Sequence, residues 1–454
     1  MYGRYAMEDT NNSSRKNIAR MGFHYYQDMD HFTEKDLSRW LPELESLGAA
    51  WLVIQSAPDR AIPEPFIRGL LQRGIEPIVQ MQIALFNPPE QSSLRLVLES
   101  YSRWGIRYIQ LFDRPNLTSS WTSAAWFQED LVERFLDRFL PLAEIIVDLG
   151  MMPVFSPLEP GGNYWDTAFL RSALESIERR KQSELFEKMV LSAYAYTFSK
   201  PLDWGAGGPD RWSGVRPYFT PEGCEDQLGF RIADWYSSIS KSVLGRELPV
   251  FLFGVGLQSN PSEPQGEVIP PEVYSSFIMD ITASLLEPSP EKEYQPGESI
   301  LPTHPSVKAA AFWLLAADWE SKYKQFAWYD EDGESAPVVL AIKEFAALHS
   351  EPIQAKSLPP ISPGDQRLEH YLLLPTYEWG VADWHLDVIR PYVKKYQPTI
   401  GFSLKDASLA RQVTVIGNTQ VFPDSDLEMM RSNGCQVERI SGDGTSIATQ
   451  LAER

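Results

Sequence analysis

The stretch "IEPIVQMQIALFNPPEQSSLRLVLESYSRWGIRYIQLFDRPN", residues 75–116, contains the unit that decides the fold. The apolar run at 75–85 predicts a strand, and 89–105 has the apolar spacing of an amphipathic helix that ends in Gly105. A second apolar run, 106–116, begins directly after that glycine. Both runs are apolar throughout rather than alternating, which is typical of parallel strands covered on both faces. The stretch therefore predicts two parallel strands joined by a helix.

This strand–helix unit occurs eight times between residues 21 and 350. We expect strands at 21–28, 49–57, 75–85, 106–116, 151–160, 189–198, 248–260 and 307–317, and helices at 34–48, 63–74, 89–105, 123–150, 166–188, 223–245, 271–287 and 337–350. Five helices end in a glycine of the kind that caps helix C-termini: Gly48, Gly74, Gly105, Gly150 and Gly245. Eight such units predict an α/β protein with a (β/α)8 TIM barrel. A doubly wound open sheet is the second choice, because no Gly-rich phosphate turn follows the first strand.

The segments outside the barrel divide into three parts. Residues 1–20 are expected to form a disordered or extended N-terminal arm, and 351–366, rich in Pro and Ser, a linker. Residues 367–454 are expected to form a small α/β layered, flavodoxin-like module. Its strands are predicted at 368–375, 398–403, 411–417 and 435–440, and its last helix at 444–454.

Composition and charge exclude some partners. The net charge of −20 disfavours nucleic acid and anionic membrane surfaces, which both attract basic proteins. Cys224 and Cys435 are the only cysteines, so neither a disulfide framework nor a zinc knuckle is expected. The first twenty residues have no apolar centre, and no stretch is long and apolar enough to span a bilayer. We expect a cytoplasmic protein as the chain is given, or an extracellular one if an export signal is missing from it.

The candidate site lies where the strands of such a barrel end, because working residues of these barrels come from the C-terminal ends of the strands. Amide, carboxylate and aromatic side chains gather there, which suits a cleft for an oligo- or polysaccharide. The residues expected to bind it are His24, Tyr25, Asp113, Arg114, Asn116, Glu159, Tyr196, Trp204, Trp212, Gln258 and Trp313. No cofactor is expected. The segment "HYYQDMDH" (His24, Asp28, Asp30 and His31) lacks helical ligand spacing, so no metal site is predicted.

The barrel resembles the large clan of retaining glycoside hydrolases with a (β/α)8 fold. The resemblance rests on "FDRPN" at strand four, "LFGVG" at strand seven and "FWLL" at strand eight. In that clan strand four ends in Asn-Glu-Pro, whose glutamate is the acid/base. Strand seven ends in a Thr-Glu-x-Gly-like turn, whose glutamate is the nucleophile, and a tryptophan of strand eight floors the sugar site. The matching residues here are Pro115, Asn116, Gly256 and Trp313.

Both catalytic positions depart from the clan. Arg114 stands at the acid/base position and Gly254 at the nucleophile position. Retaining hydrolysis needs two carboxyl groups about 5–5.5 Å apart, and an arginine does not give up its proton at neutral pH. Asp113 and Glu159 are the candidate replacement carboxylates. Adjacent residues of an extended strand point to opposite sides, so only one of Asp113 and Arg114 is expected to face the barrel axis.

The C-terminal module is similar to the second half of a cell-wall-binding repeat of type 2. The matching segments are 413–417, 437–442 and 445–448, whereas Asn418 replaces the second glycine of the family's Gly-Gly pair. That family works in arrays of three repeats and this chain has at most one. The resemblance implies contact with a partner or a cell-wall polymer, and a plain α/β domain fits equally well.

Three functions remain open. The favoured hypothesis is a glycoside-hydrolase-like barrel that binds a carbohydrate without standard retaining activity. In it Arg114 hydrogen-bonds a sugar hydroxyl or pairs with an acidic sugar, although a purely structural pairing with Asp113 or Glu159 is also open. The first alternative is an active hydrolase that uses Asp113 and Glu159. The second is a scaffold whose barrel mouth is closed by its own loop at 203–222.

Overall fold

The computed structural model describes residues 16–261, 269–286, 301–330, 332–349, 351–352, 368–375, 383–396, 398–408, 410–432 and 434–454. Most of the expected N-terminal arm and of the expected linker lies outside these residues. From these two segments, β1 (Lys16–Asn17) pairs with β10 (Glu351–Pro352) in antiparallel register. The start and the end of the barrel segment are thus joined.

The described residues between 21 and 349 form the barrel. Its strands one to eight are β2 (Met21–His24), β3 (Trp51–Ser56), β4 (Glu76–Met81), β5 (Tyr108–Leu111), β6 (Met152–Val154), β7 (Leu191–Tyr194), β8 (Val250–Val255) and β9 (Val307–Phe312). They pair in parallel in the order β6-β5-β4-β3-β2-β9-β8-β7. Single parallel bridges, Val154–Val190 and Leu158–Ala193, join β6 to β7 and close the ring. The expected (β/α)8 barrel is therefore confirmed, and the open sheet is excluded.

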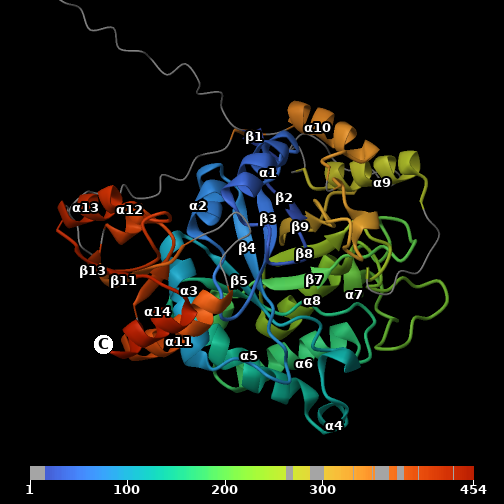
Figure 1. Cartoon of the computed structure of the whole chain (residues 1–454). Helices are drawn as coiled ribbons and strands as arrows, with labels where there is room; N and C mark the ends of the chain where they lie inside the picture. The colour runs from blue at the N-terminus through green and yellow to red at the C-terminus, as the bar shows by residue number, and fades with distance from the viewer. Residues whose placement is uncertain are drawn as a thin grey trace, which may run out of the picture.

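The barrel helices surround these strands (Figure 1). They are α1 (Glu34–Ser46), α2 (Glu64–Gln72), α3 (Gln91–Trp104), α4 (Ser123–Trp126), α5 (Leu131–Asp148), α6 (Asp166–Arg179), α7 (Gly208–Arg211), α8 (Ile232–Leu244), α9 (Pro271–Ser284) and α10 (Pro337–His349). All five glycines expected to cap helices have positive φ, between 70° and 95°. Only glycine adopts that conformation without strain, so these local signals were correct. None of the helices in the described segments combines the length and the apolarity needed to cross a membrane.

Most expected helices end within three residues of the prediction, but three differ more. The segment 123–150 is broken into α4 and α5, because Asp130 at the junction has φ 60°. The helix predicted from residue 223 begins at Ile232, after a turn in which Gly223 has φ 77°. The helix predicted over 166–188 ends at Arg179, beyond which the chain forms a 3-10 turn at Ser183–Glu187. The apolar spacing of the sequence continues through these turns, so the sequence did not indicate that the helices are interrupted there.

The C-terminal module contains a parallel sheet of four strands between helices. Its strands are β11 (Leu368–Leu373), β12 (Thr399–Gly401), β13 (Ala410–Ile416) and β14 (Gln436–Ile440), in the order β12-β11-β13-β14. Its helices are α11 (Asp383–Tyr396), α12 (Leu404–Ala407), α13 (Asp424–Ser432) and α14 (Gly444–Ala452). Separate apolar clusters cover the two faces of the sheet, one with α11 and α14 and the other with α12 and α13. This layered arrangement confirms the expected α/β module.

The module lies beside α2 and α3 of the barrel (Figure 1). Leu96 of α3 packs into the apolar cluster of the module that contains Ile389 and Leu451. Asp406 of α12 approaches Arg68 of α2 with an oxygen–nitrogen distance of 3.8 Å. Next to it, Glu64 is fully buried and pairs with the same arginine. A buried polar cluster of Glu64, Arg68 and Asp406 thus joins the two parts of the chain.

Candidate functional site

A pocket of about 230 Å³ opens at the C-terminal ends of the barrel strands. Its lining comes from the ends of, or the loops after, seven of the eight strands: Gln27, Asp28, Met29, Gln55, Gln80, Gln82, Asp113, Arg114, Tyr194, Tyr196, Pro261, Trp313 and Tyr323. Four residues that the sequence singled out for carbohydrate binding lie in it, namely Asp113, Arg114, Tyr196 and Trp313. Side chains of the loop 203–222 do not contribute to its lining.

Arg114 forms the charged centre of this pocket. Its Nε and Nη2 lie 2.9 and 2.8 Å from Oδ2 of Asp113, and its Nη1 lies 3.7 Å from Oε2 of Glu159. The guanidinium also stands over the ring of Tyr194, 5.2 Å from the centroid. Burial lowers the pKa of Arg114, but the charges of Asp113 and its neighbours outweigh burial and raise the pKa above its ordinary value. Arg114 is therefore a permanent cation held by two carboxylates.

The backbone at Arg114 explains why both members of the Asp-Arg pair reach the pocket. β5 ends at Leu111, and Phe112 and Arg114 then adopt φ of 57° and 43°. The NH of Arg114 donates to the carbonyl of Pro157, 3.0 Å away, which fixes this turn. The expectation that only one of Asp113 and Arg114 faces the axis was wrong, because it assumed an extended strand.

Aromatic side chains form one wall of the pocket. Tyr194 and Tyr196 are stacked with centroids 5.2 Å apart and planes inclined by 15°. The hydroxyl of Tyr194 donates to Oδ1 of Asp113 at 2.8 Å. Burial, followed by the charge of Asp113, raises the pKa of Tyr194 well above its ordinary value, so the phenol keeps its proton. Trp313 directly follows β9 and packs edge-on against Tyr323, with centroids 5.5 Å apart.

A row of glutamines forms the opposite side. Gln55 and Gln80 face each other in register on β3 and β4, and the amide of Gln55 donates to Oε1 of Gln80 at 2.5 Å. Gln55 also donates to Gln27 at 3.3 Å and accepts a hydrogen bond from Gln82. An amide carries one acceptor oxygen and two donor hydrogens. The row can therefore both donate hydrogen bonds to hydroxyl groups and accept hydrogen bonds from them.

Asn116 and Glu159 lie behind the pocket. Asn116 is fully buried, and its Nδ2 donates to the carbonyls of Glu159 and Tyr164, both at 2.9 Å. Its Oδ1 accepts from the NH of Glu159, also at 2.9 Å. These bonds occupy the side chain, so Asn116 positions the loop that carries Glu159. The Glu159 carboxylate contacts Asn260 as well as Arg114.

His24 and Tyr25 are buried at the end of β2. Nε2 of His24 accepts from the NH of Gly254 at 3.2 Å, and burial lowers the pKa of His24 to about 3. The imidazole is therefore neutral at physiological pH. Tyr25 is fully buried and packs against Tyr26, Phe32 and Phe66.

Three other expected site residues lie elsewhere. Trp204 donates to Asp226 at 3.0 Å, and Trp212 donates to the carbonyl of Ala206, also at 3.0 Å. Both bonds fold the loop after β7 onto itself. Gln258, after β8, accepts through its backbone carbonyl from the NH of Phe198 at 2.7 Å. None of these side chains forms part of the pocket lining.

Gly254 of β8 has no room for a side chain. This residue has φ 62°, and a Cβ there would lie 2.7 Å from Cε1 of Tyr196. A glutamate could not replace it without displacing the tyrosine, because both the backbone conformation and the contact exclude a side chain. Strand seven therefore carries no side chain at this position.

Sequence reasoning missed several lining residues, among them Gln27, Met29, Pro261 and Tyr323. They lie in loops beyond the strand ends, where no periodic pattern indicates which side chain turns inward. Gln55, Gln80 and Gln82 are polar residues within the apolar runs of two predicted strands, and they lie at or next to the ends of the observed β3 and β4.

Comparison with known proteins adds a similarity in structure. No family model matches the chain, and no curated protein sequence does. A family 39 glycoside hydrolase from the gut symbiont Bacteroides cellulosilyticus WH2 is 14% identical, with a TM-score of 0.46 over 74% of this chain and 64% of that one. A GH39 β-xylosidase from Caulobacter crescentus is 11% identical, with a TM-score of 0.43 over 74% of this chain and 73% of that one. The exo-β-1,4-mannosidase Op5Man5 from Opitutaceae bacterium strain TAV5 is 12% identical, with a TM-score of 0.34 over 95% of this chain and 79% of that one. This chain thus spans less than two thirds of the Bacteroides enzyme.

Proposed function

We propose that the protein binds a carbohydrate in the mouth of the barrel without standard retaining hydrolysis. The observation that carries this proposal is the composition of the pocket: stacked tyrosines and a tryptophan face a row of glutamine amides, with Arg114 clamped between carboxylates. Sugars present hydroxyl groups at their edges and CH groups on their faces. Amides suit the first and aromatic rings the second.

The charges of the pocket favour a neutral sugar. The guanidinium fork of Arg114, which could have bound an acidic sugar, faces Asp113, and its side chain is only 21% exposed. Asp28 and Asp113 also line the pocket, and Glu159 lies within 3.7 Å of the guanidinium. Asp28 is paired with His31. The two carboxylates of Asp113 and Glu159 against one arginine leave the region negative, so an additional sugar carboxylate would be repelled.

The absence of standard retaining chemistry is supported by the position of Arg114. Two carboxyl groups must face each other across the scissile bond, one of them able to donate a proton. Here the guanidinium contacts both Asp113 and Glu159, so it occupies the region where that bond would lie.

Replacing Trp313 by alanine is expected to weaken binding of a neutral oligosaccharide about tenfold or more. The ring lines the pocket, and losing roughly 1.4 kcal/mol of aromatic contact corresponds to a factor of ten. The measurement is calorimetric titration, after a glycan array has identified a ligand for the unmodified protein. Uronic-acid oligosaccharides of the same length are expected to bind more weakly than neutral ones.

The matched control is Trp319→Ala, because Trp319 is 65% exposed and is not part of the pocket lining. Its affinity should equal that of the unmodified protein. Absence of binding to every glycan would refute the carbohydrate proposal. Cleavage of the bound oligosaccharide that disappears in both Asp113→Asn and Glu159→Gln would refute the non-catalytic part and favour the relocated carboxylate pair.

A further inference from the structure

Two buried side chains of the pocket wall carry hydrogen-bond donors without a partner. Among the described residues, nothing pairs with the hydroxyl of Tyr196 or with Nε1 of Trp313, although both residues line the pocket. Tyr196 is 1% and Trp313 6% exposed, so bulk water does not reach these two atoms. Nε2 of Gln27, also in the lining, is a third such donor. Buried polar groups are rarely left unpaired, so these donors indicate a partner that the protein does not supply.

Tyr196 and Trp313 pack against the same part of β8. A Cβ at Gly254 would lie 2.7 Å from Cε1 of Tyr196. The NH of Gly254 donates to His24, and the ring centroids of His24 and Trp313 are 4.8 Å apart. The NH of Trp313 donates to the carbonyl of Val255 at 3.0 Å. The two side chains thus belong to one corner of the pocket and to one buried cluster.

All three unpartnered atoms can donate. An indole NH and an amide nitrogen have no acceptor function. The amide oxygen of Gln27 already accepts from Gln55 at 3.3 Å, which leaves the nitrogen as the free end of that side chain. Burial, followed by the charge of Glu159, raises the pKa of Tyr196 well above its ordinary value, so the phenol keeps its proton. The pocket therefore offers three neutral donors.

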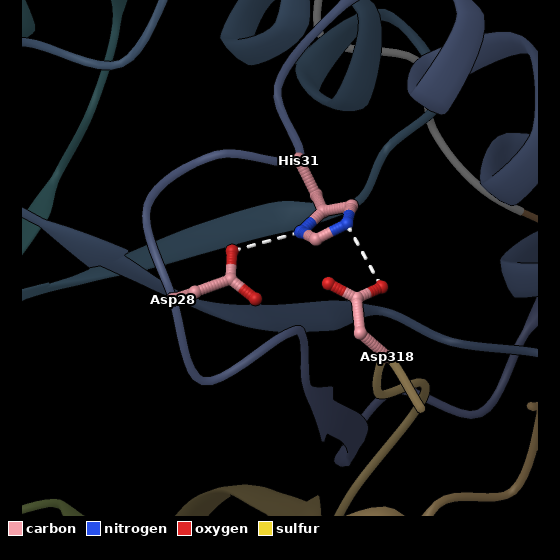
Figure 2. Close-up of side chains that lie close together, drawn as sticks. All are labelled: Asp28, His31 and Asp318. Atoms are coloured by element: carbon pink, nitrogen blue, oxygen red, sulfur yellow. Dashed lines mark hydrogen bonds and ion pairs between the residues drawn. The ribbon is translucent and has the colours of Figure 1, made fainter. Parts of the chain in front are cut away.

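Carboxylate acceptors of the pocket, by contrast, have partners within the protein. Oδ2 of Asp113 accepts from Nε of Arg114 at 2.9 Å. Oδ1 of Asp28 accepts from Nδ1 of His31 at 2.8 Å, and Nε2 of the same ring is 3.2 Å from Asp318 (Figure 2). Among the lining residues, every buried side-chain atom without a partner can donate. A ligand of this pocket must therefore bring acceptor oxygens.

The acceptor that fits best is a neutral carbonyl. A sugar hydroxyl accepts, but it also brings a hydrogen that needs an acceptor of its own. A carboxylate or sulfate only accepts, yet Asp113 and Glu159 against Arg114 leave the region negative. The carbonyl of an N-acetyl group is neutral and has two lone pairs, so it can accept from two donors. Its methyl group suits the aromatic rings of Tyr196 and Trp313.

We propose that the pocket binds an N-acetylated amino sugar, whose amide carbonyl accepts hydrogen bonds from the Tyr196 hydroxyl and the Trp313 indole. The inference rests on the proposed carbohydrate binding and names the class of sugar. The preference arises because a sugar without the acetamido group leaves at least one of these buried donors unpaired, which costs affinity.

Calorimetric titration with matched pairs of sugars tests this inference. N,N′-diacetylchitobiose and cellobiose differ only in carrying an acetamido or a hydroxyl group beside each anomeric carbon. N-acetylgalactosamine with galactose, and N-acetylmannosamine with mannose, extend the comparison to other ring configurations. In at least one pair the acetamido sugar should bind about tenfold more tightly or better, because it pairs the buried donors.

Tyr196→Phe removes only the hydroxyl. The preference for the acetamido sugar should fall about tenfold, whereas the affinity for its hydroxyl counterpart should hardly change. The thermal midpoint should not fall, because the hydroxyl has no partner to lose among the described residues. Tyr396→Phe is the matched control, since Tyr396 is an exposed tyrosine on α11 of the C-terminal module. Its preference should be that of the unmodified protein.

Equal affinities within every pair would overturn the inference and leave carbohydrate binding as proposed. A preference that Tyr196→Phe retains in full would do the same, because the hydroxyl would not contact the acetamido group. A lower thermal midpoint of Tyr196→Phe would show that the hydroxyl is bonded within the protein and would also overturn the assignment. Absence of binding to every glycan would instead refute the carbohydrate proposal itself.

Discussion

Replacing Asn116 by alanine is expected to lower the free energy of unfolding by about 2–5 kcal/mol. The side chain is fully buried and makes three hydrogen bonds to the backbone of Glu159 and Tyr164. Alanine would leave the NH of Glu159 and the carbonyl of Tyr164 without these partners, and each unpaired buried group costs about 1–3 kcal/mol. Urea denaturation followed by tryptophan fluorescence measures the loss.

Asn163→Ala is the control for this variant. Asn163 is exposed, and its Oδ1 accepts from the NH and the hydroxyl of Thr118 at 2.9 and 3.1 Å. Water can replace both bonds, so the expected loss is about 1 kcal/mol or less. If the two variants were equally stable, Asn116 would not hold the loop of Glu159 in place.

The second large effect concerns pH and the contact between the barrel and the C-terminal module. Burial, followed by the neighbouring carboxyl of Asp406, raises the pKa of Glu64 from its ordinary 4.5 to about 8, although Arg68 opposes the shift. In the unfolded chain Glu64 loses its proton near pH 4.5, whereas the folded chain keeps it up to about pH 8. The folded state thus binds more protons, and its stability from this group falls as the pH rises between these values.

Glu64→Gln should remove this dependence. Glutamine does not titrate, and its amide can donate to the carboxylate of Asp406. At pH 5 the variant and the unmodified protein should be similarly stable. At pH 9 the variant should be more stable by a few kcal/mol, since each pKa unit corresponds to about 1.4 kcal/mol. Urea denaturation at several pH values gives the difference.

Glu99→Gln provides the comparison, because Glu99 pairs with Arg95 on the exposed surface of α3 at 3.1 Å. A surface pair of this kind contributes about 0–1 kcal/mol, and the stability difference should hardly change with pH. Parallel pH curves for Glu64→Gln and the unmodified protein would show that Glu64 is ionised in the folded state. The buried cluster at the module contact would then be a plain ion-pair network.

The fold was predictable because its signals are local. Each strand appears as a short apolar run, and glycines such as Gly105 and Gly245 adopt the positive φ that closes their helices. The errors also have local causes. Turns such as that at Asp130 interrupt segments whose apolar spacing continues through them, since spacing records which side chains are buried and not whether the backbone stays helical.

The site was only partly predictable. Arg114 and Trp313 line the pocket, because both lie just after strand ends, where a closed parallel barrel brings side chains together. Trp204 and Trp212 do not, since loop residues can bond within their own loop, as these two do. The sequence named Asp113 and Glu159 as possible partners of Arg114. That the guanidinium reaches both carboxylates depends on the backbone turn at Phe112 and Arg114.

The sequence by itself determined the eight strand–helix units, the caps of the helices and the acidic character of the chain, because each depends on residues close together along it. Only the tertiary structure decided that Arg114 would be clamped by Asp113 and Glu159, that Gly254 would be closed by Tyr196, and that Asp318 would meet His31. Apart from the pair of neighbours Asp113 and Arg114, these contacts join residues tens to hundreds of positions apart. Their distances are set by how the strands close into a ring and how the loops turn back over it, which no local pattern of residues records.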